Sequence, residues 1–212
     1  TLRYAVMNGQ ILPGRALTIR ELAGILDVSP MPVREALRQL AAENALEIQG
    51  NRRVMVPRMT AMKFNELCEA RMAIEPHAAA RALPYIDATR LAELRQMDSL
   101  IDEAQERGDL EQVSLLNQNF HRALYTANPH QVTLPLIESL WLQLGPFMRL
   151  ATSKLDEHYL VDRHKELTDA IEKKDALALQ LALTADIRDG IAFAGTPELL
   201  HRFIEQSASG GR

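Results

Sequence analysis

Four polar side chains fall within, or directly beside, the apolar stripes of helices that the sequence predicts. Asn117 and His121 lie one turn apart beside the stripe of a helix expected over residues 109–127, and His164 and Asp186 occupy stripe positions of two later helices. Burying such a group without a partner costs roughly 1–3 kcal/mol for a neutral group and more for a carboxylate. The four side chains therefore need polar partners in the interior.

A single divalent metal ion would satisfy all four groups. Two imidazoles, a carboxylate and an amide oxygen are nitrogen and oxygen donors without a thiolate, a set that suits Zn²⁺, Ni²⁺, Mn²⁺ or Fe²⁺ and does not choose among them. The first alternative is that each group makes a local hydrogen bond. The second is a metalloenzyme, because two histidines and a carboxylate with an open position could activate water. The sequence offers only Glu166 nearby as a general base for that reaction.

The other candidate side chains are interpreted as structural. Cys68 is the single cysteine and cannot form an internal disulfide. One cysteine in a helical stretch is more often a small buried hydrophobe than a nucleophile. The remaining histidines are interpreted as structural or solvent-exposed, and they are His77, His130, His158 and His201.

Helices must position the four polar groups. From the N-cap residue Thr60 to about Gln206 the sequence shows helical periodicity without a β-rich segment. The expected helices span approximately 61–82, 87–107, 109–127, 131–151, 155–174 and 175–194. Because no fixed-period repeat is present, they predict one all-helical antiparallel bundle, followed by a disordered tail at 207–212.

The first 59 residues show another pattern, which begins with a short helical stretch whose apolar positions are Leu2, Ala5 and Val6. Thr18 and Glu21 form a capping box for a helix over 19–26. After a tight turn, Ser29 is a suitable N-cap for a further helix that has Pro30 at its first position. Three helices with a tight turn between the second and the third predict a helix-turn-helix.

A hairpin completes a winged helix-turn-helix. The β-like runs ALEIQ and RVMVP flank Gly50-Asn51. Arg34 and Arg38 lie together on a face of the preceding helix away from its apolar stripe. A helix of this kind enters the major groove of B-DNA, while the hairpin reaches the backbone or the minor groove. The pattern predicts double-stranded DNA as a partner.

Composition and charge are consistent with a globular protein whose N-terminal part binds a polyanion. The chain has 212 residues, 47% of them hydrophobic and 25% charged, which excludes collagen-like and disordered classes. Residues 1–60 have a net charge of +3, from eight arginines and five acids, whereas the remainder carries −7. No long apolar run and no signal peptide is present, so we expect a cytoplasmic protein without a membrane span. The first residue, Thr1, indicates a trimmed N-terminus.

Several segments carry a resemblance to a known family. GQILPGRAL, LAGILDVSPMPVREALRQLAAENAL and GNRRVMV resemble the DNA-binding domain of GntR-superfamily bacterial transcription regulators. EARMAIEPHAAARAL, NQNFHRALYTAN and HKELTDAIEKKDALALQLALTADI resemble the helical ligand-binding domain, called FCD, of the FadR-like subfamily. The resemblance spans about residues 1–195. It implies a mostly α fold, with a winged helix-turn-helix over 1–59 and a helical effector-binding and dimerisation domain over 60–206.

The resemblance also implies which residues contact DNA. In the family, these contacts come from the start of the second helix, the start of the recognition helix and the wing. Carried over by position, with two further arginines as candidates, the DNA-binding set is Arg20, Ser29, Arg34, Arg38, Gly50, Asn51, Arg52 and Arg53. The family usually has arginine directly after the turn serine, where this chain has Pro30, so we expect a different operator or weaker binding.

Metal-binding FCD domains use an aspartate and a histidine one turn apart, with two histidines on later helices. This chain has Asn117 in place of the usual aspartate and Asp186 in place of the usual last histidine. The resemblance therefore implies a metal set of Asn117, His121, His164 and Asp186, in which the carboxylate has moved to another helix.

Arg71 lies where FCD domains commonly place an arginine that faces the effector cavity. Its guanidinium could bind a carboxylate through two hydrogen bonds; the alternative is an ion pair with Glu75, four residues on. The resemblance implies a homodimeric transcription regulator, not an enzyme. We expect a repressor that binds a pseudo-palindromic operator under the control of a small organic acid, with the metal assisting. The alternative regulator senses the metal itself.

Overall fold

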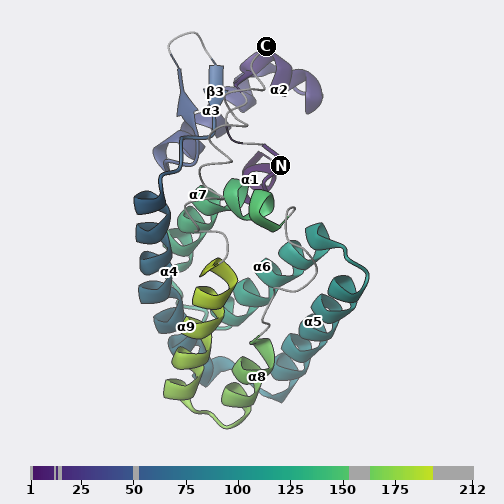
Figure 1. Ribbon diagram of the computed structural model, residues 1–212, viewed down its shortest axis with the longest axis vertical. Coiled ribbons are helices and arrows are strands. Elements are labelled where there is room, and N and C mark those ends of the chain that lie inside the picture. The colour runs from purple at the N-terminus through teal and green to yellow at the C-terminus, as the bar shows by residue number, and fades with distance from the viewer. Residues whose placement is uncertain (1, 12, 14–15, 50–52, 153–162, 193–212) are drawn as a thin grey trace.

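The protein is mostly helical, and its computed structural model describes residues 2–11, 13, 16–49, 53–152 and 163–192. The first elements are α1 (Leu2–Met7), β1 (Leu17–Thr18), α2 (Ile19–Ile25), α3 (Pro30–Ala42), β2 (Glu47–Ile48) and β3 (Arg53–Met55). The later elements are α4 (Ala61–Ala82), the 3-10 turn η1 (Leu83–Tyr85), α5 (Ala88–Glu106), α6 (Leu110–Thr126), α7 (Leu134–Thr152), α8 (His164–Glu172) and α9 (Ala176–Ala192). Figure 1 shows α2, α3 and the strands at one end of the molecule and α4 to α9 at the other.

The helix-turn-helix forms as its local signals predict. Both hydrogen bonds of the capping box between Thr18 and Glu21 are present at the start of α2. Asp27 adopts a left-handed backbone, with φ of 52°, in the turn after α2. Ser29 occupies the N-cap position of α3, but its side chain makes no capping hydrogen bond. The Ser29 hydroxyl therefore does not have the capping role that the sequence suggested.

The wing contains one strand more than the sequence predicts. β2 and β3 pair antiparallel as the expected hairpin, with Glu47 opposite Met55. β1, which the sequence analysis did not predict, pairs with the other edge of β3, with Leu17 opposite Val54. The three-stranded sheet therefore has the order β1-β3-β2. This added pairing ties the segment before α2 to the base of the wing.

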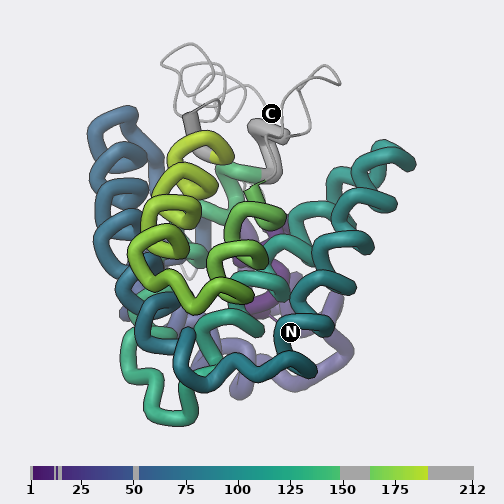
Figure 2. The backbone as a smooth tube through the Cα atoms, turned by 90° about the horizontal axis from the view of Figure 1, so that it is seen from below, coloured from purple at the N-terminus to yellow at the C-terminus, as the bar shows by residue number. Residues whose placement is uncertain are grey.

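The helical part is a bundle in which α4, α9, α8 and α5 follow one another, with α6 and α7 packed inside that arc. α4 packs against α9, α9 against α8 and α8 against α5, while α6 contacts α4, α5 and α7. Figure 2 shows this order from below. The first turns of α4, α5 and α6 are capped by Thr60, Asp87 and Asp109. α8 begins at His164, and the expected earlier start at residue 155 lies outside the described residues.

α1 lies between the two parts of the molecule. It packs against α7 of the bundle and against α3 of the helix-turn-helix. The buried side chains Leu2, Val6 and Met7 belong to the same hydrophobic core as the bundle residues. Among the described residues, no helix is both long and apolar enough to cross a membrane.

Candidate functional site

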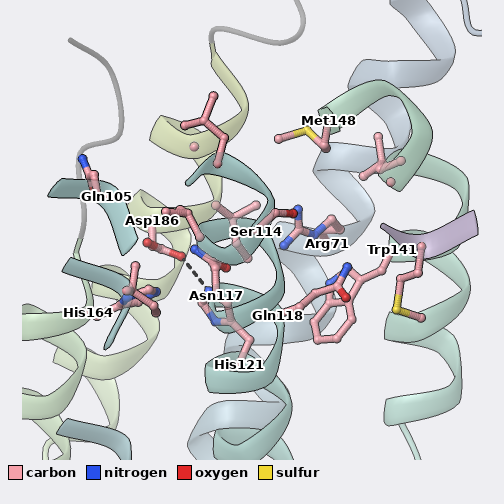
Figure 3. A pocket seen from close by; sticks show the side chains of 18 residues that line it. Arg71, Gln105, Ser114, Asn117, Gln118, His121, Trp141, Met148, His164 and Asp186 are labelled. Atoms are coloured by element: carbon pink, nitrogen blue, oxygen red, sulfur yellow. Dashed lines mark ion pairs between the residues drawn. The ribbon is translucent and has the colours of Figure 1, made fainter. Parts of the chain in front are cut away.

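Three helices bring three potential metal ligands together in the interior of the bundle. His121 comes from α6, His164 from α8 and Asp186 from α9, and one ligand atom from each lies within 4.8 Å of the others. All three side chains are buried. His121 Nε2 lies 3.2 Å from Asp186 Oδ2, the pair joined by a dashed line in Figure 3. This chemistry, two imidazoles and a carboxylate, could hold a divalent metal ion.

A polar group lies close to the Nδ1 atom of each imidazole ring. The Tyr125 hydroxyl lies 3.5 Å from His121 Nδ1. Asp98 Oδ1 lies 3.3 Å from His164 Nδ1, an ion-pair distance. Histidine ligands of metals commonly engage their other ring nitrogen in this way, which fixes the ring and its tautomer. His121 Nε2 then faces Asp186, and one ring nitrogen of His164 lies within reach of the same position.

The surroundings keep Asp186 ionised. Burial raises the pKa of its carboxyl, but the hydrogen bond with His121 and the electrostatic influence of His121, His164 and Arg71 outweigh burial and leave the pKa below its ordinary value. An anionic carboxylate beside two imidazoles favours a bound cation. The residues present therefore fit a metal ion.

The cluster opens into a cavity of about 150 Å³ that Arg71 also lines. Figure 3 shows Arg71 reaching into this cavity from α4, opposite Asp186 and His164. Asn117 lines the same cavity one turn before His121. The other polar residues in the wall are Gln105, Ser114 and Gln118. The wall thus provides a cation, several amide groups and the three potential metal ligands.

Arg71 is held in place by the ion pair that the sequence analysis gave as the alternative. Its Nε donates to Glu75 Oε1 at 2.5 Å and its Nη2 donates to Oε2 at 3.4 Å. Glu75 is fully buried and also accepts from the Tyr125 hydroxyl at 2.8 Å and from Trp141 Nε1 at 3.0 Å. Burial alone would lower the pKa of Arg71, but the charge of Glu75 raises it. Nη1 makes no hydrogen bond to Glu75, so the ion pair still leaves donors for an anion in the cavity.

The proposed DNA-contacting residues that the structure describes lie on the outside of the helix-turn-helix. The exposed members of this set are Arg20, Ser29, Arg34, Arg38 and Arg53. Arg38 Nη1 lies 3.9 Å from Glu35 Oε2, so its charge has a local partner. The wing-tip candidates Gly50, Asn51 and Arg52 lie outside the described residues.

Several residues set aside in the sequence occupy structural positions. Cys68 is buried, and burial raises the pKa of its thiol to about 11. His77 and His130 are exposed, whereas His158 and His201 lie outside the described residues. Glu166, which the sequence analysis considered as a general base, pairs with Arg163 at 2.9 Å on the surface.

The sequence analysis missed the groups that support the site. Tyr125 follows His121 by four residues, so helical spacing could have identified it. Asp98, Trp141 and Met7 come from three other helices, and Met7 lines the cavity from α1. No local pattern connects those three to the metal cluster.

A winged helix-turn-helix joined to a helical bundle with a buried polar cavity defines a DNA-binding transcription regulator. The family model for the FCD domain matches residues 66–189, and the model for bacterial regulatory proteins of the gntR family matches residues 1–56. The chain belongs to the GntR family, in the branch with a C-terminal FCD domain. This is a family of transcription regulators, not of enzymes.

Named relatives and solved structures agree with this assignment. The HTH-type transcriptional regulator McbR of Escherichia coli strain K12 is 30% identical over 196 residues, covering 90% of this chain and 88% of McbR. The HTH-type transcriptional repressor RspR of the same strain is 26% identical over 189 residues, covering 89% of this chain and 83% of RspR. The solved structure of E. coli McbR/YncC superposes with a TM-score of 0.80 at 26% identity, covering 100% of this chain and 95% of that chain.

Proposed function

We propose that the chain is a homodimeric repressor of the bacterial cytoplasm whose binding to a pseudo-palindromic operator is controlled by a small organic acid in the helical cavity. The observation that carries this proposal is the cavity of about 150 Å³ that joins Arg71 to the cluster of His121, His164 and Asp186. RspR and the gluconate operon regulator of Bacillus subtilis are named as repressors, which supports repression here.

The helix-turn-helix and the wing would make different kinds of contact with DNA. Arg34 lies on the exposed face near the start of α3 and would contact base edges in the major groove. Ser29 and Arg20 would contact the duplex beside it. Arg38 and Arg53 would neutralise phosphates, together with the wing tip over 50–52. We place the boundary of this DNA-binding unit between residues 59 and 60, directly before the Thr60 cap of α4, and the effector and dimerisation unit over 60–206.

Two charged regions of the polar cavity wall would bind the ligand. The donors of Arg71 that Glu75 does not use would bind a carboxylate of the acid. His121, His164 and Asp186 would hold a divalent metal, with the Asn117 amide oxygen as a fourth candidate donor. When bound, the metal supplies a positive charge that anchors an anionic oxygen. Because the donors are nitrogen and oxygen, Zn²⁺, Ni²⁺, Mn²⁺ and Fe²⁺ all fit the set.

Control of DNA binding requires that the acid bind two arrangements of the dimer with different affinity. Two winged units must sit at the spacing of two half-sites to bind together. An acid that favours another arrangement of the bundle would change that spacing.

The test combines metal analysis with a ligand screen. Protein purified without an affinity-tag metal column should contain bound metal. A thermal-shift screen of small mono-, di- and tricarboxylates should then find an acid that raises the melting temperature. The shift should fall after chelation, and it should also fall in Arg71→Lys, which keeps a positive charge beside Glu75 but loses the bidentate guanidinium. Stabilisation by metal without any acid would instead indicate a metal sensor, and no response to metal or acid would contradict the proposal.

A further inference from the structure

The cavity is closed on one side by a residue of the DNA-binding unit. Met7 lies at the end of α1, within the 1–56 segment that matches the gntR family model. Its side chain lines the cavity together with residues of the bundle, and only 7% of Met7 is exposed. The ribbon of α1 is visible at the edge of the cavity in Figure 3.

Met7 completes an apolar wall whose other members lie on one face of α7. Trp141, Leu144, Gly145 and Met148 all line the cavity, and their spacing places them on the same side of the helix. This wall faces the polar side formed by Arg71 and the histidines. An acid that fills the cavity would therefore direct its apolar body toward α7 and Met7.

At Gly145 the backbones of α1 and α7 touch with no side chain between them. A Cβ atom on Gly145 would lie 3.0 Å from Met7 Cα and closer still to the Met7 carbonyl group. Such a separation is too short for non-bonded atoms, so either helix would have to move. Because α1 has only six residues whereas α7 has 19, we expect α1 to move.

α1 is also tied to the recognition helix. Arg3 Nη1 lies 2.6 Å from Glu43 Oε1 at the C-cap of α3, and Arg3 Nη2 lies 3.4 Å from Glu138 Oε2 on α7. Glu138 also pairs with Arg122, the residue after the candidate ligand His121. One side chain of α1 thus joins the end of the recognition helix to the bundle.

We propose that Met7 is an effector-contacting residue and that α1 transmits occupation of the cavity to the recognition helix. The inference rests on the proposed function, since it assumes that the cavity binds the effector. The apolar part of the acid meets Met7, the lining residue that belongs to the DNA-binding unit. Displacement of Met7 moves α1, and the Arg3 contacts transfer that movement to α3.

The test compares two glycines of the cavity wall. Gly145→Ala inserts a methyl group against Met7, whereas Gly190→Ala adds the same group to α9, where nothing lies within 4 Å. Two readouts are measured on the full chain. The first is acrylamide quenching of Trp141, the only tryptophan of the chain. The second is affinity for a duplex selected from random sequences with the original protein.

Gly145→Ala should at least double the quenching constant of Trp141, because α1 no longer seals the cavity. It should also change operator affinity by fivefold or more. Gly190→Ala should leave both readouts within about 1.5-fold of the original. Far-ultraviolet circular dichroism and thermal melting confirm that each variant is folded.

Met7→Ala covers the case in which Gly145→Ala does not fold. It removes the wall without a clash, so it should raise the quenching constant and shift operator affinity by threefold or more. If folded Gly145→Ala or Met7→Ala opens the cavity but binds the operator like the original, α1 is not the transmitting element. If neither variant changes the quenching of Trp141, Met7 does not seal the cavity. Neither readout needs an acid, so the role of α1 is tested independently of the ligand screen. The contact between Met7 and the effector, in contrast, falls together with the proposed function if no acid binds.

Discussion

At the scale of single residues, the site is a set of buried charges that compensate one another. Asp186 lies against His121, and Glu75 lies against Arg71, Tyr125 and Trp141. Buried charges are tolerated only when they are paired and hydrogen-bonded. The Asp186 contact therefore leads to a prediction about metal binding, and the Glu75 contacts lead to a prediction about stability.

Asp186→Ala should severely lower metal content, because it removes the only anionic ligand of the proposed set. Asn117→Asp should retain or raise metal content, because it adds a second carboxylate to the cavity wall. Asp186→His combined with Asn117→Asp should bind metal at least as tightly as the original chain. Metal stoichiometry after reconstitution, with thermal melting before and after chelation, checks all three. An original protein that takes up no metal and melts identically with chelator would contradict the metal site.

Glu75→Ala should lower the free energy of unfolding by about 3–5 kcal/mol, because it leaves the Arg71 guanidinium in the interior without its anion. Chemical denaturation measures the change. The control is Glu172→Ala, which breaks an exposed pair with Arg95 and should barely move the midpoint. Equal effects of the two substitutions would show that Glu75 does not neutralise a buried charge.

At the scale of secondary structure, local sequence signals predicted most helices and two of the three strands of the wing. Thr18, Thr60 and Pro30 mark the starts of helices in the sequence, and α2, α4 and α3 begin there. β1 was missed because two residues show no periodic pattern and their partners on β3 lie far along the chain.

The candidate site was predictable only to the level of helix faces. One-turn spacing placed Asn117 and His121 beside one apolar stripe, but convergence with His164 and Asp186 rested on the family resemblance. The contacts of Glu75 with Tyr125 and Trp141 join three helices, so no local spacing reveals them together. The place of Met7 in the wall depends on how two units of the chain pack, which sequence periodicity does not encode.

Arg34→Ala tests α3 as the recognition helix. A bidentate arginine contact to a base contributes about 1–3 kcal/mol of discrimination, so the variant should lose its preference for operator over random DNA. Because Arg34 is exposed, the substitution should leave the fold of the protein unchanged. Fluorescence anisotropy titrations on both duplexes measure the preference. Operator affinity within twofold of the original would rule out the proposed role of Arg34.

Arg53→Ala tests the wing and should behave differently. Arg53 lies exposed on β3, where a phosphate contact does not depend on sequence. Its loss should weaken operator and random DNA to a similar degree and reduce the dependence of affinity on salt. The same titrations over a range of salt concentrations check this. A loss confined to the operator would mean that the wing reads bases.

At the scale of the whole molecule, the proposed regulation requires communication between two parts of opposite charge. The first 60 residues carry +3 and the rest −7, so DNA attracts one end and repels the other. The cavity and the recognition helix are joined through α1, which contacts both α7 and α3. Linkage requires that a cavity ligand and DNA change each other's affinity by the same factor.

The most direct test is the operator affinity of the full chain with and without the acid found by the thermal-shift screen, in the presence of the bound metal. A saturating acid should change the dissociation constant at least fivefold. Arg71→Lys, which keeps a positive charge beside Glu75 but loses the bidentate guanidinium, should reduce that change while keeping operator binding. An operator affinity that stays the same while the acid occupies the cavity would show that the acid does not control DNA binding.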